Sequence, residues 1–73
     1  MNKLLLENIV KAVNTELKNG LISVDIESDN YHFICDKPSD IDYDGNMISI
    51  YIDDNNRIRI HHKTIDSIKI VEL

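Results

Sequence analysis

The sequence predicts a small α+β domain in which an N-terminal amphipathic helix is followed by about five antiparallel strands. Two patterns lead to this prediction. Apolar residues recur at three- and four-residue spacing as far as Gly20, which is typical of a helix with one buried face. Beyond Gly20 they alternate with polar residues, which is typical of strands with one face in water. The length of 73 residues fits a single domain over residues 1–73, and its 13 isoleucines suffice for a packed core.

The first predicted element is a helix over residues 2–18. Its apolar stripe consists of Leu6, Ile9, Val10, Val13 and Leu17. Asn2 is expected to cap the first turn, because an asparagine oxygen accepts hydrogen bonds from the free backbone N–H groups there. Gly20 is expected to end the helix in the left-handed conformation that glycine adopts readily.

Five strands are predicted over about residues 21–28, 31–36, 47–53, 57–62 and 67–72. Facing residues of an antiparallel pair share one side of the sheet, so a two-residue turn at Asp29 and Asn30 keeps the apolar residues of the first hairpin together. This register places Ile26 opposite Phe33. Asp and Asn tolerate the positive φ that such a turn requires.

The second hairpin is predicted to turn through three residues, 54–56, because a two-residue turn would place inward residues opposite outward ones. Asn56 is expected to take the left-handed conformation. The resulting register places Asp53 opposite Arg57, and Tyr51 opposite Arg59, on the outer face.

The connections around this hairpin differ in length. Residues 37–45 are predicted to form a long acidic loop before the third strand, whose inward residues include Ile52. A short helical turn is expected to precede the last strand.

This order of elements resembles the SH3-like and Sm-like class of small five-stranded barrels. In that class a short turn separates the last two strands and an N-terminal helix covers one open end, so the resemblance implies a barrel. The alternative is an open α+β fold in which the helix lies on a four- or five-stranded antiparallel sheet. The glycine and asparagine motifs of Sm-type RNA-binding loops do not occur in the sequence, so the resemblance does not imply RNA binding.

The motifs of common catalytic and cofactor sites do not occur in the sequence: there is no nucleophile elbow, no phosphate-binding glycine loop and no HExxH. We therefore expect a protein that is not an enzyme and has no cofactor. Cys35 lies in an apolar run and is expected to be a buried thiol. His61 and His62 are adjacent, so in a strand they would point to opposite faces and would not bind one ion together. No signal peptide or membrane span is recognised, and we expect a cytoplasmic location.

The stretch DIDYDGN begins like a calcium-binding loop. The matching residues are Asp40, Asp42, Asp44 and Gly45. The twelfth position of such a loop is a bidentate glutamate, but here it is Tyr51, and the flanking patterns are those of strands. We therefore predict no specific metal site, and the three aspartates remain only weak candidates for a divalent ion.

Negative charge is concentrated in the middle of the chain. Residues 25–54 contain nine acidic residues and one lysine, a net charge of −8, whereas the whole chain carries −5. A strongly negative surface attracts a basic partner and speeds its association. The predicted partner-binding residues, with the tyrosines as aromatic anchors, are Asp36, Asp40, Asp42, Tyr43, Asp44, Tyr51, Asp53 and Asp54.

We therefore expect a small acidic, non-enzymatic binding protein that engages a basic protein surface. Its most specific form is a phage-type inhibitor of a nucleic-acid-handling host defence system, an anti-CRISPR or anti-restriction protein that presents carboxylates where phosphates would bind. One alternative is an Sm-like or SH3-like nucleic-acid-binding module, based on Arg57, Arg59 and His61, that forms homo-oligomers through its strand edges. Another is a phage structural subunit.

Overall fold

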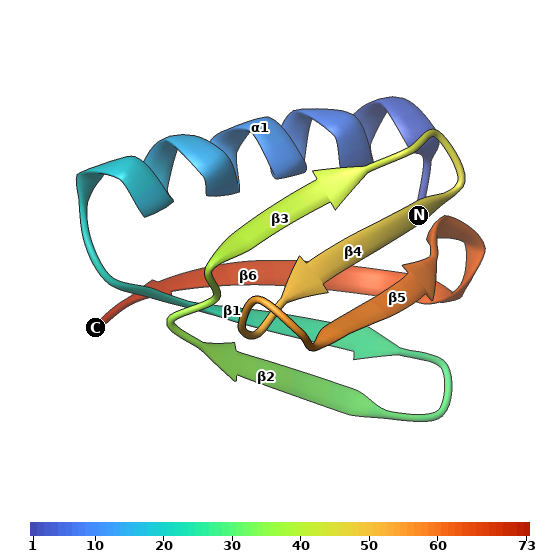
Figure 1. Ribbon diagram of the computed structural model, residues 1–73. Coiled ribbons are helices and arrows are strands. Elements are labelled where there is room, and N and C mark those ends of the chain that lie inside the picture. The colour runs from blue at the N-terminus through green and yellow to red at the C-terminus, as the bar shows by residue number, and fades with distance from the viewer.

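The computed structural model describes residues 1–73 as one helix and two antiparallel three-stranded sheets (Figure 1). In order, the elements are α1 Lys3–Asn19, β1 Ile22–Ser28, β2 His32–Asp36, β3 Asp40–Tyr43, β4 Met47–Tyr51, β5 Arg57–His61, the 3-10 helix η1 His62–Thr64 and β6 Ile65–Glu72. The first sheet has the strand order β2-β1-β6, and the second sheet β3-β4-β5. The predicted mixed α+β class is confirmed, with six strands in place of about five. No strand pairing joins the two sheets into a closed barrel.

The ends of α1 agree with the prediction to within one residue. The Oδ1 atom of Asn2 accepts from the backbone N–H groups of Leu4 and Leu5 at 2.8 and 3.2 Å, which confirms the predicted cap. At the other end, the Gly20 N–H donates to the Glu16 carbonyl at 3.1 Å. The backbone of Gly20 is extended, with φ 172°, so the predicted left-handed conformation is wrong.

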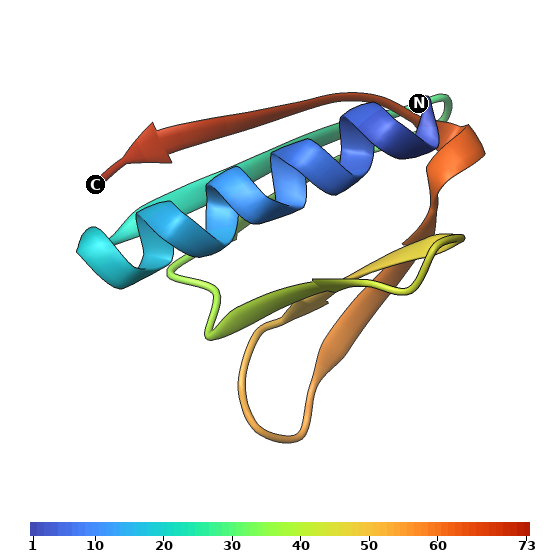
Figure 2. The same ribbon diagram turned by 90° about the horizontal axis from the view of Figure 1, so that it is seen from above.

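The apolar stripe of α1 faces the core, as predicted. Its members are the buried Leu6, Val10 and Val13 and the partly buried Ile9 and Leu17. Seen from above, α1 runs along the opening between the sheets, with β1 and β6 on one side and β3 on the other (Figure 2). The Asn14 side-chain amide donates to the Ile41 carbonyl of β3 at 3.2 Å, so the helix also satisfies a backbone acceptor at the edge of the second sheet.

The first hairpin has the predicted register. Ile26 of β1 faces Phe33 of β2. The chain reverses at residues 29–30, where the Ser28 N–H donates to the Tyr31 carbonyl at 2.9 Å. Neither turn residue has a positive φ, so the expected left-handed conformation is wrong although the turn length is right.

The predicted acidic loop over residues 37–45 is wrong in its centre, because Asp40–Tyr43 form β3. This strand pairs with β4, places Ile41 in the core and leaves Asp42 exposed. Lys37, with a φ of 55°, lies where the chain leaves the first sheet for the second. The alternation of Asp40, Ile41, Asp42 and Tyr43 fits a strand, but four residues is the shortest run for which alternation indicates one, and the turn-forming residues on both sides favour a loop.

The second hairpin, β4 to β5, is displaced by two residues from its predicted register. Tyr51 faces Arg57 rather than Arg59, and the connection has five residues, Ile52–Asn56, rather than three. Ile52 is 45% exposed and does not belong to the core. Because side chains alternate with a period of two, this shift leaves every paired residue on its predicted face.

The chain reaches β6 through η1, beside the N-terminal residue. The Met1 amino group donates to the carbonyl oxygens of His62 and Ile65 at 2.6 and 2.9 Å. The His62 ring is buried, with its Nδ1 atom 3.0 Å from the Met1 carbonyl oxygen. The predicted helical turn before the last strand is confirmed, and the strand begins at Ile65, earlier than predicted.

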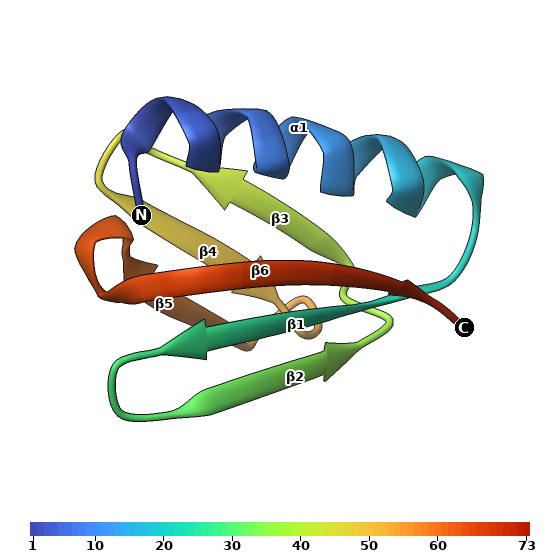
Figure 3. The same cartoon turned by 180° about the vertical axis from the view of Figure 1, so that it is seen from behind.

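One cluster of twelve buried apolar residues joins the helix and both sheets. It contains Leu6, Val10, Val13, Ile22, Val24, Ile26, Cys35, Ile41, Ile48, Ile50, Ile60 and Ile65. Burial, followed by the charge of Asp36, raises the pKa of the Cys35 thiol, which is buried as predicted. The outer faces of the two sheets point away from each other. Figure 3, viewed from the side opposite to Figure 1, shows the outer face of the first sheet in front. No helix has the length and apolar content needed to cross a membrane.

Candidate functional site

The outer face of the second sheet carries charges that are sorted by strand. Its three rows are Asp40–Tyr51–Arg57, Asp42–Ser49–Arg59 and, beside the β3–β4 turn, Asp44–Met47–His61. Acidic residues therefore lie on the β3 side, neutral residues on β4 and basic residues on β5. No other element covers this face (Figures 1 and 2).

The alternation that builds the core also produces this face. Ile41 of β3, Ile50 of β4 and Ile60 of β5 are at most 2% exposed on the inner side. Their neighbours along each strand point outward. In β3 the outward aspartates alternate with Ile41 and Tyr43, and in β5 the outward basic residues alternate with isoleucines, so each outer strand presents charges of one sign.

Asp44 holds the turn between β3 and β4. Its Oδ1 atom accepts from the backbone N–H groups of Met47 and Asn46 at 2.8 and 2.9 Å, and Gly45 adopts a φ of 97°. Its Oδ2 atom accepts from Nη2 of Arg59 at 2.9 Å. These backbone hydrogen bonds, that of Met47 first, and the guanidinium hold the pKa of Asp44 below its ordinary value. The carboxylate that matched a calcium ligand is therefore bound within the chain.

Arg59 joins the two sides of the face at this end. Its cross-strand neighbour on β4 is Ser49, but its guanidinium extends past that strand to Asp44. Ser49, which lies between Arg59 and Asp42, is only 6% exposed. The acidic and basic sides are thus connected here by one ion pair.

At the other end of the face, charges of both signs lack a partner. The ion pairs of the chain are Glu7–Lys11, Asp25–His32 and Asp44–Arg59. Asp40, Asp42 and Arg57 belong to none of them. The Arg57 Nη1 atom lies 3.5 Å from the Tyr51 hydroxyl oxygen. The backbones of Asp40 and Arg57 are separated by two strand spacings, roughly 10 Å, with Tyr51 between them.

The β4–β5 turn closes this end of the face. The Oδ1 atom of Asp53 accepts from the backbone N–H groups of Asn55 and Asn56 at 2.8 and 2.9 Å, and the Asn56 side-chain amide donates to the same carboxylate. These hydrogen bonds, the Asn56 side chain's first, lower the pKa of Asp53. Asp53 therefore caps its own turn, and its predicted position opposite Arg57 is wrong, as is the left-handed conformation predicted for Asn56. An adjoining hollow of about 200 Å³ is lined by Tyr51, Asp54, Asn55, Asn56 and Arg57.

Two of the predicted partner-binding residues lie elsewhere. Asp36 is exposed at the end of β2, in the first sheet. Tyr43 faces Ile48 on the inner side of the second sheet and packs, partly buried, against the core. Desolvation, followed by the charges of Glu7 and Asp44, raises the pKa of Tyr43. The other six lie on the outer face of the second sheet or in its two turns: Asp40, Asp42, Asp44, Tyr51, Asp53 and Asp54.

No three His, Cys, Asp or Glu side chains are placed to hold one metal ion. The rings of His61 and His62 lie with their centroids 4.6 Å apart, so their predicted orientation to opposite faces is wrong. The reason is that His62 already belongs to η1, where the alternation of the strand has ended. Desolvation, followed by the charges of His62, Lys63 and Lys3, lowers the pKa of His61.

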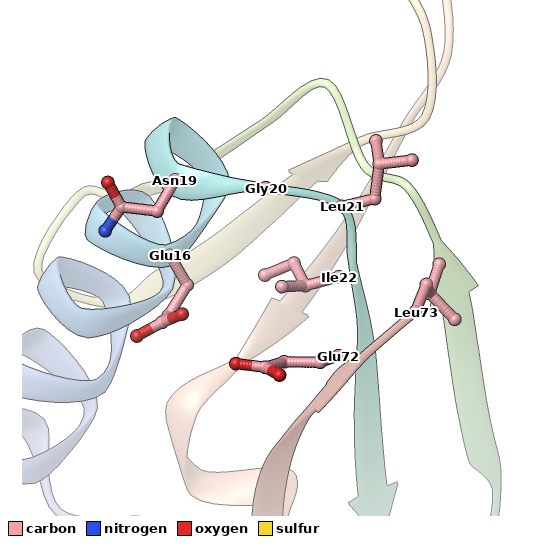
Figure 4. A pocket seen from close by; sticks show the side chains of 7 residues that line it. All are labelled: Glu16, Asn19, Gly20, Leu21, Ile22, Glu72 and Leu73. Carbon is pink, nitrogen blue, oxygen red and sulfur yellow. The ribbon is translucent and has the colours of Figure 1, made fainter.

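A separate hollow of about 250 Å³ lies where α1 leads into β1, beside the end of β6 (Figure 4). Its lining residues are Glu16, Asn19, Gly20, Leu21, Ile22, Glu72 and Leu73. The carboxylates of Glu16 and Glu72 both face this hollow, whereas Leu21 and Leu73 point away from them (Figure 4). No sequence pattern predicted this grouping, because its members come from opposite ends of the chain.

The sequence prediction also missed that Arg57 and Arg59 share a face with Asp40 and Asp42. The sequence does show that both pairs of charged residues alternate with apolar residues, which is consistent with one shared face. Their proximity, however, depends on β3, which was not predicted. No protein-family model, curated protein or solved structure matches this chain.

Proposed function

We propose that this chain is a small, non-enzymatic binding protein that engages a basic protein surface through the β3 side of the second sheet. The observation that carries the proposal is that Asp40 and Asp42 are exposed on one face and have no cationic partner in the chain. Such carboxylates remain free to attract an incoming cation, whereas the negative charge of Asp44 is partly neutralised by its ion pair with Arg59.

The partner that we propose is a nucleic-acid-handling protein of a host defence system in the cytoplasm. The chain would then be a phage-type inhibitor of the anti-CRISPR or anti-restriction kind. Channels that bind nucleic acid present lysine and arginine side chains to phosphates. Asp40 and Asp42 lie about 7 Å apart along one strand, and the β4–β5 turn adds the exposed Asp53 and Asp54. This row of carboxylates supports the proposal that the β3 side occupies such a channel in place of phosphates.

The test compares two double variants that remove equal charge from different faces. Asp40→Asn/Asp42→Asn neutralises the β3 side and leaves the turn residues Asp44 and Asp53 in place. The control, Glu27→Gln/Asp66→Asn, neutralises two exposed residues of the first sheet. Pull-down from host lysate identifies a candidate partner, and calorimetry with that purified protein gives the dissociation constants.

We expect binding at least ten-fold weaker for Asp40→Asn/Asp42→Asn than for the wild-type chain, and little change for the control. The difference should shrink as salt is raised, because salt screens exposed charges. A partner that binds both double variants with equal affinity would refute the proposal.

A second candidate function is the oligomeric nucleic-acid-binding module of the SH3-like or Sm-like kind. The alignment of Arg57, Arg59 and His61 on the outer side of β5 favours it, because such a row provides a basic strip. Titration with single-stranded RNA at two salt concentrations separates the candidates. Salt-dependent affinity that is lost in Arg57→Glu would favour the module, and absence of affinity would remove it.

A further inference from the structure

The outer face of the second sheet is self-complementary in charge. Asp40 and Asp42 lie on its β3 side, Arg57 and Arg59 lie on its β5 side, and Tyr51 stands on the neutral strand between them. A face that is negative on one side and positive on the other matches a copy of itself if the copy is turned the right way.

Two orientations place a second copy face to face about a two-fold axis in the plane of the sheet. If the axis is perpendicular to the strands, β3 of one copy lies over β3 of the other, and like charges meet. If the axis is parallel to β4, β3 of one copy lies over β5 of the other, and each row places an acidic residue over a basic one. Electrostatic complementarity therefore selects the axis along β4.

We infer that a second copy of this chain binds the outer face of the second sheet about a two-fold axis along β4. Asp40 then lies over Arg57 of the second copy, and Asp42 over Arg59 of the second copy, each contact occurring twice by symmetry. This arrangement pairs charges that the fold keeps apart, because Asp40 and Arg57 of one chain are separated by Tyr51 and roughly 10 Å. Tyr51 lies close to the axis, where it meets its own counterpart as an aromatic contact.

The size of the face sets the strength of this dimer. Three strands of about five residues cover roughly 15 by 17 Å. This footprint is well below the roughly 800 Å² that each partner buries in a stable complex. The dimer is therefore weak and reversible. It also covers Asp40 and Asp42, so a basic partner of the proposed function and a second copy compete for the same residues.

The test is analytical ultracentrifugation of the whole chain at millimolar concentration in 0.1 M salt. At this ionic strength the net charge of −5 on each copy is screened beyond about 10 Å, whereas charges in contact still attract. The wild-type chain should sediment with an average mass above that of the monomer and return to the monomer mass in 1 M salt.

Two charge-reversal variants locate the contact. Asp40→Lys makes both sides of the first row positive, and Arg57→Glu makes both sides negative, so each variant alone should be monomeric. An equimolar mixture should regain association, because the substituted residues then face opposite charges. Arg59 is left unchanged because it holds Asp44. The control Asp66→Lys reverses an exposed charge of the first sheet and should associate like the wild-type chain.

A wild-type chain that stays monomeric under these conditions would overturn the inference. So would association that neither single variant reduces or that the mixture fails to restore, since the contact would then lie elsewhere. Circular dichroism confirms that each variant is folded. The inference does not rest on the proposed function: a chain that dimerises but binds no basic protein refutes only the latter, and the reverse result refutes only the dimer.

Discussion

The two sheets carry the same kinds of charged residue on their outer faces but arrange them in opposite ways. In the first sheet a carboxylate stands on the middle strand, where Asp25 of β1 lies opposite Lys69 of β6 and contacts His32 of β2. In the second sheet the charges stand on the two outer strands, with neutral β4 between them. Side chains on adjacent strands are about 5 Å apart and can neutralise each other, whereas charges two strands apart meet only where a long side chain crosses the strand between them, as Arg59 does to reach Asp44.

The position of a charge in the sheet, rather than the number of charges, therefore decides which face remains free to bind. The central stretch of the chain is strongly acidic, yet Asp25, Asp44 and Asp53 are engaged by neighbours within the fold. Asp40 accepts a hydrogen bond from the adjacent Ile41 N–H, but neither Asp40 nor Asp42 is bound to a cation of the chain. The second sheet is therefore the better candidate for recognition.

The greatest loss of stability is predicted for a substitution in the core, which the two sheets share. Ile50 is fully buried, so Ile50→Ala should lower the free energy of unfolding by about 2–5 kcal/mol. Such a loss is comparable to the whole stability of a chain of this size. Urea unfolding followed by circular dichroism measures it. Both sheets should unfold in one transition, because they share one core and form one cooperative unit.

The matched control for this substitution is Ile34→Ala on the outer face of the first sheet. Ile34 is 57% exposed, so the free energy of unfolding should change by no more than about 0.5 kcal/mol. If the two variants are equally stable, the assignment of inner and outer faces is incorrect.

A smaller effect is expected at the turn that positions Asp44. Gly45 has a φ of 97°, and an added Cβ there would meet no atom within 4 Å, so the cost of Gly45→Ala is that of the backbone conformation alone. We expect a loss of about 1–2 kcal/mol. Gly20→Ala is the control, because Gly20 is extended and equally unobstructed. Equal losses in the two variants, measured by urea unfolding, would contradict the left-handed turn.

How much of this structure the sequence predicts depends on which turn is considered. The register of the first hairpin follows from parity and a two-residue turn, and it is observed. The second hairpin has the same parity but is displaced by two residues, because the Asp53 carboxylate binds the N–H groups of Asn55 and Asn56 and stabilises a longer turn. Alternation determines which face a residue occupies. Turn length depends instead on local hydrogen bonds, and Asp and Asn side chains can form these in turns of several lengths.

The sequence predicts most residues of the candidate site but not how they are arranged on the second sheet. Alternation alone places Arg57, Arg59 and Tyr51 on the outer face, as observed. The position of Asp40 and Asp42 beside them depends on β3, a four-residue strand that pairs with β4 and receives a hydrogen bond from Asn14 of α1. Aspartate is depleted in strands, so local propensity argues against this strand, and its alternation extends over only four residues.

The smallest expected effect is the response of the second sheet to acid. The pKa of His61 is lowered in the fold, so the unfolded chain takes up this proton first, and stability should begin to fall below about pH 6.5. The pKa values of Asp44 and Asp53 are also lowered, by hydrogen bonds to their carboxylates. The stability that these two residues provide is therefore present above about pH 4 and is lost as the pH falls through their folded values.

Urea unfolding between pH 8 and pH 2.5 tests these assignments with variants that remove one titration each. Asp44→Asn and Asp53→Asn keep an oxygen that accepts the backbone hydrogen bonds of the turn, but they cannot be protonated. Both should flatten the loss of stability below pH 4, and His61→Gln should flatten the earlier decline. Since protonation of Asp44 also removes its ion pair with Arg59, 1 M salt should reduce the contribution of Asp44 more than that of Asp53, which is held by neutral donors. An acid response that is unchanged in Asp44→Asn/Asp53→Asn would mean that the turns of the second sheet owe nothing to these carboxylates in their ionised form.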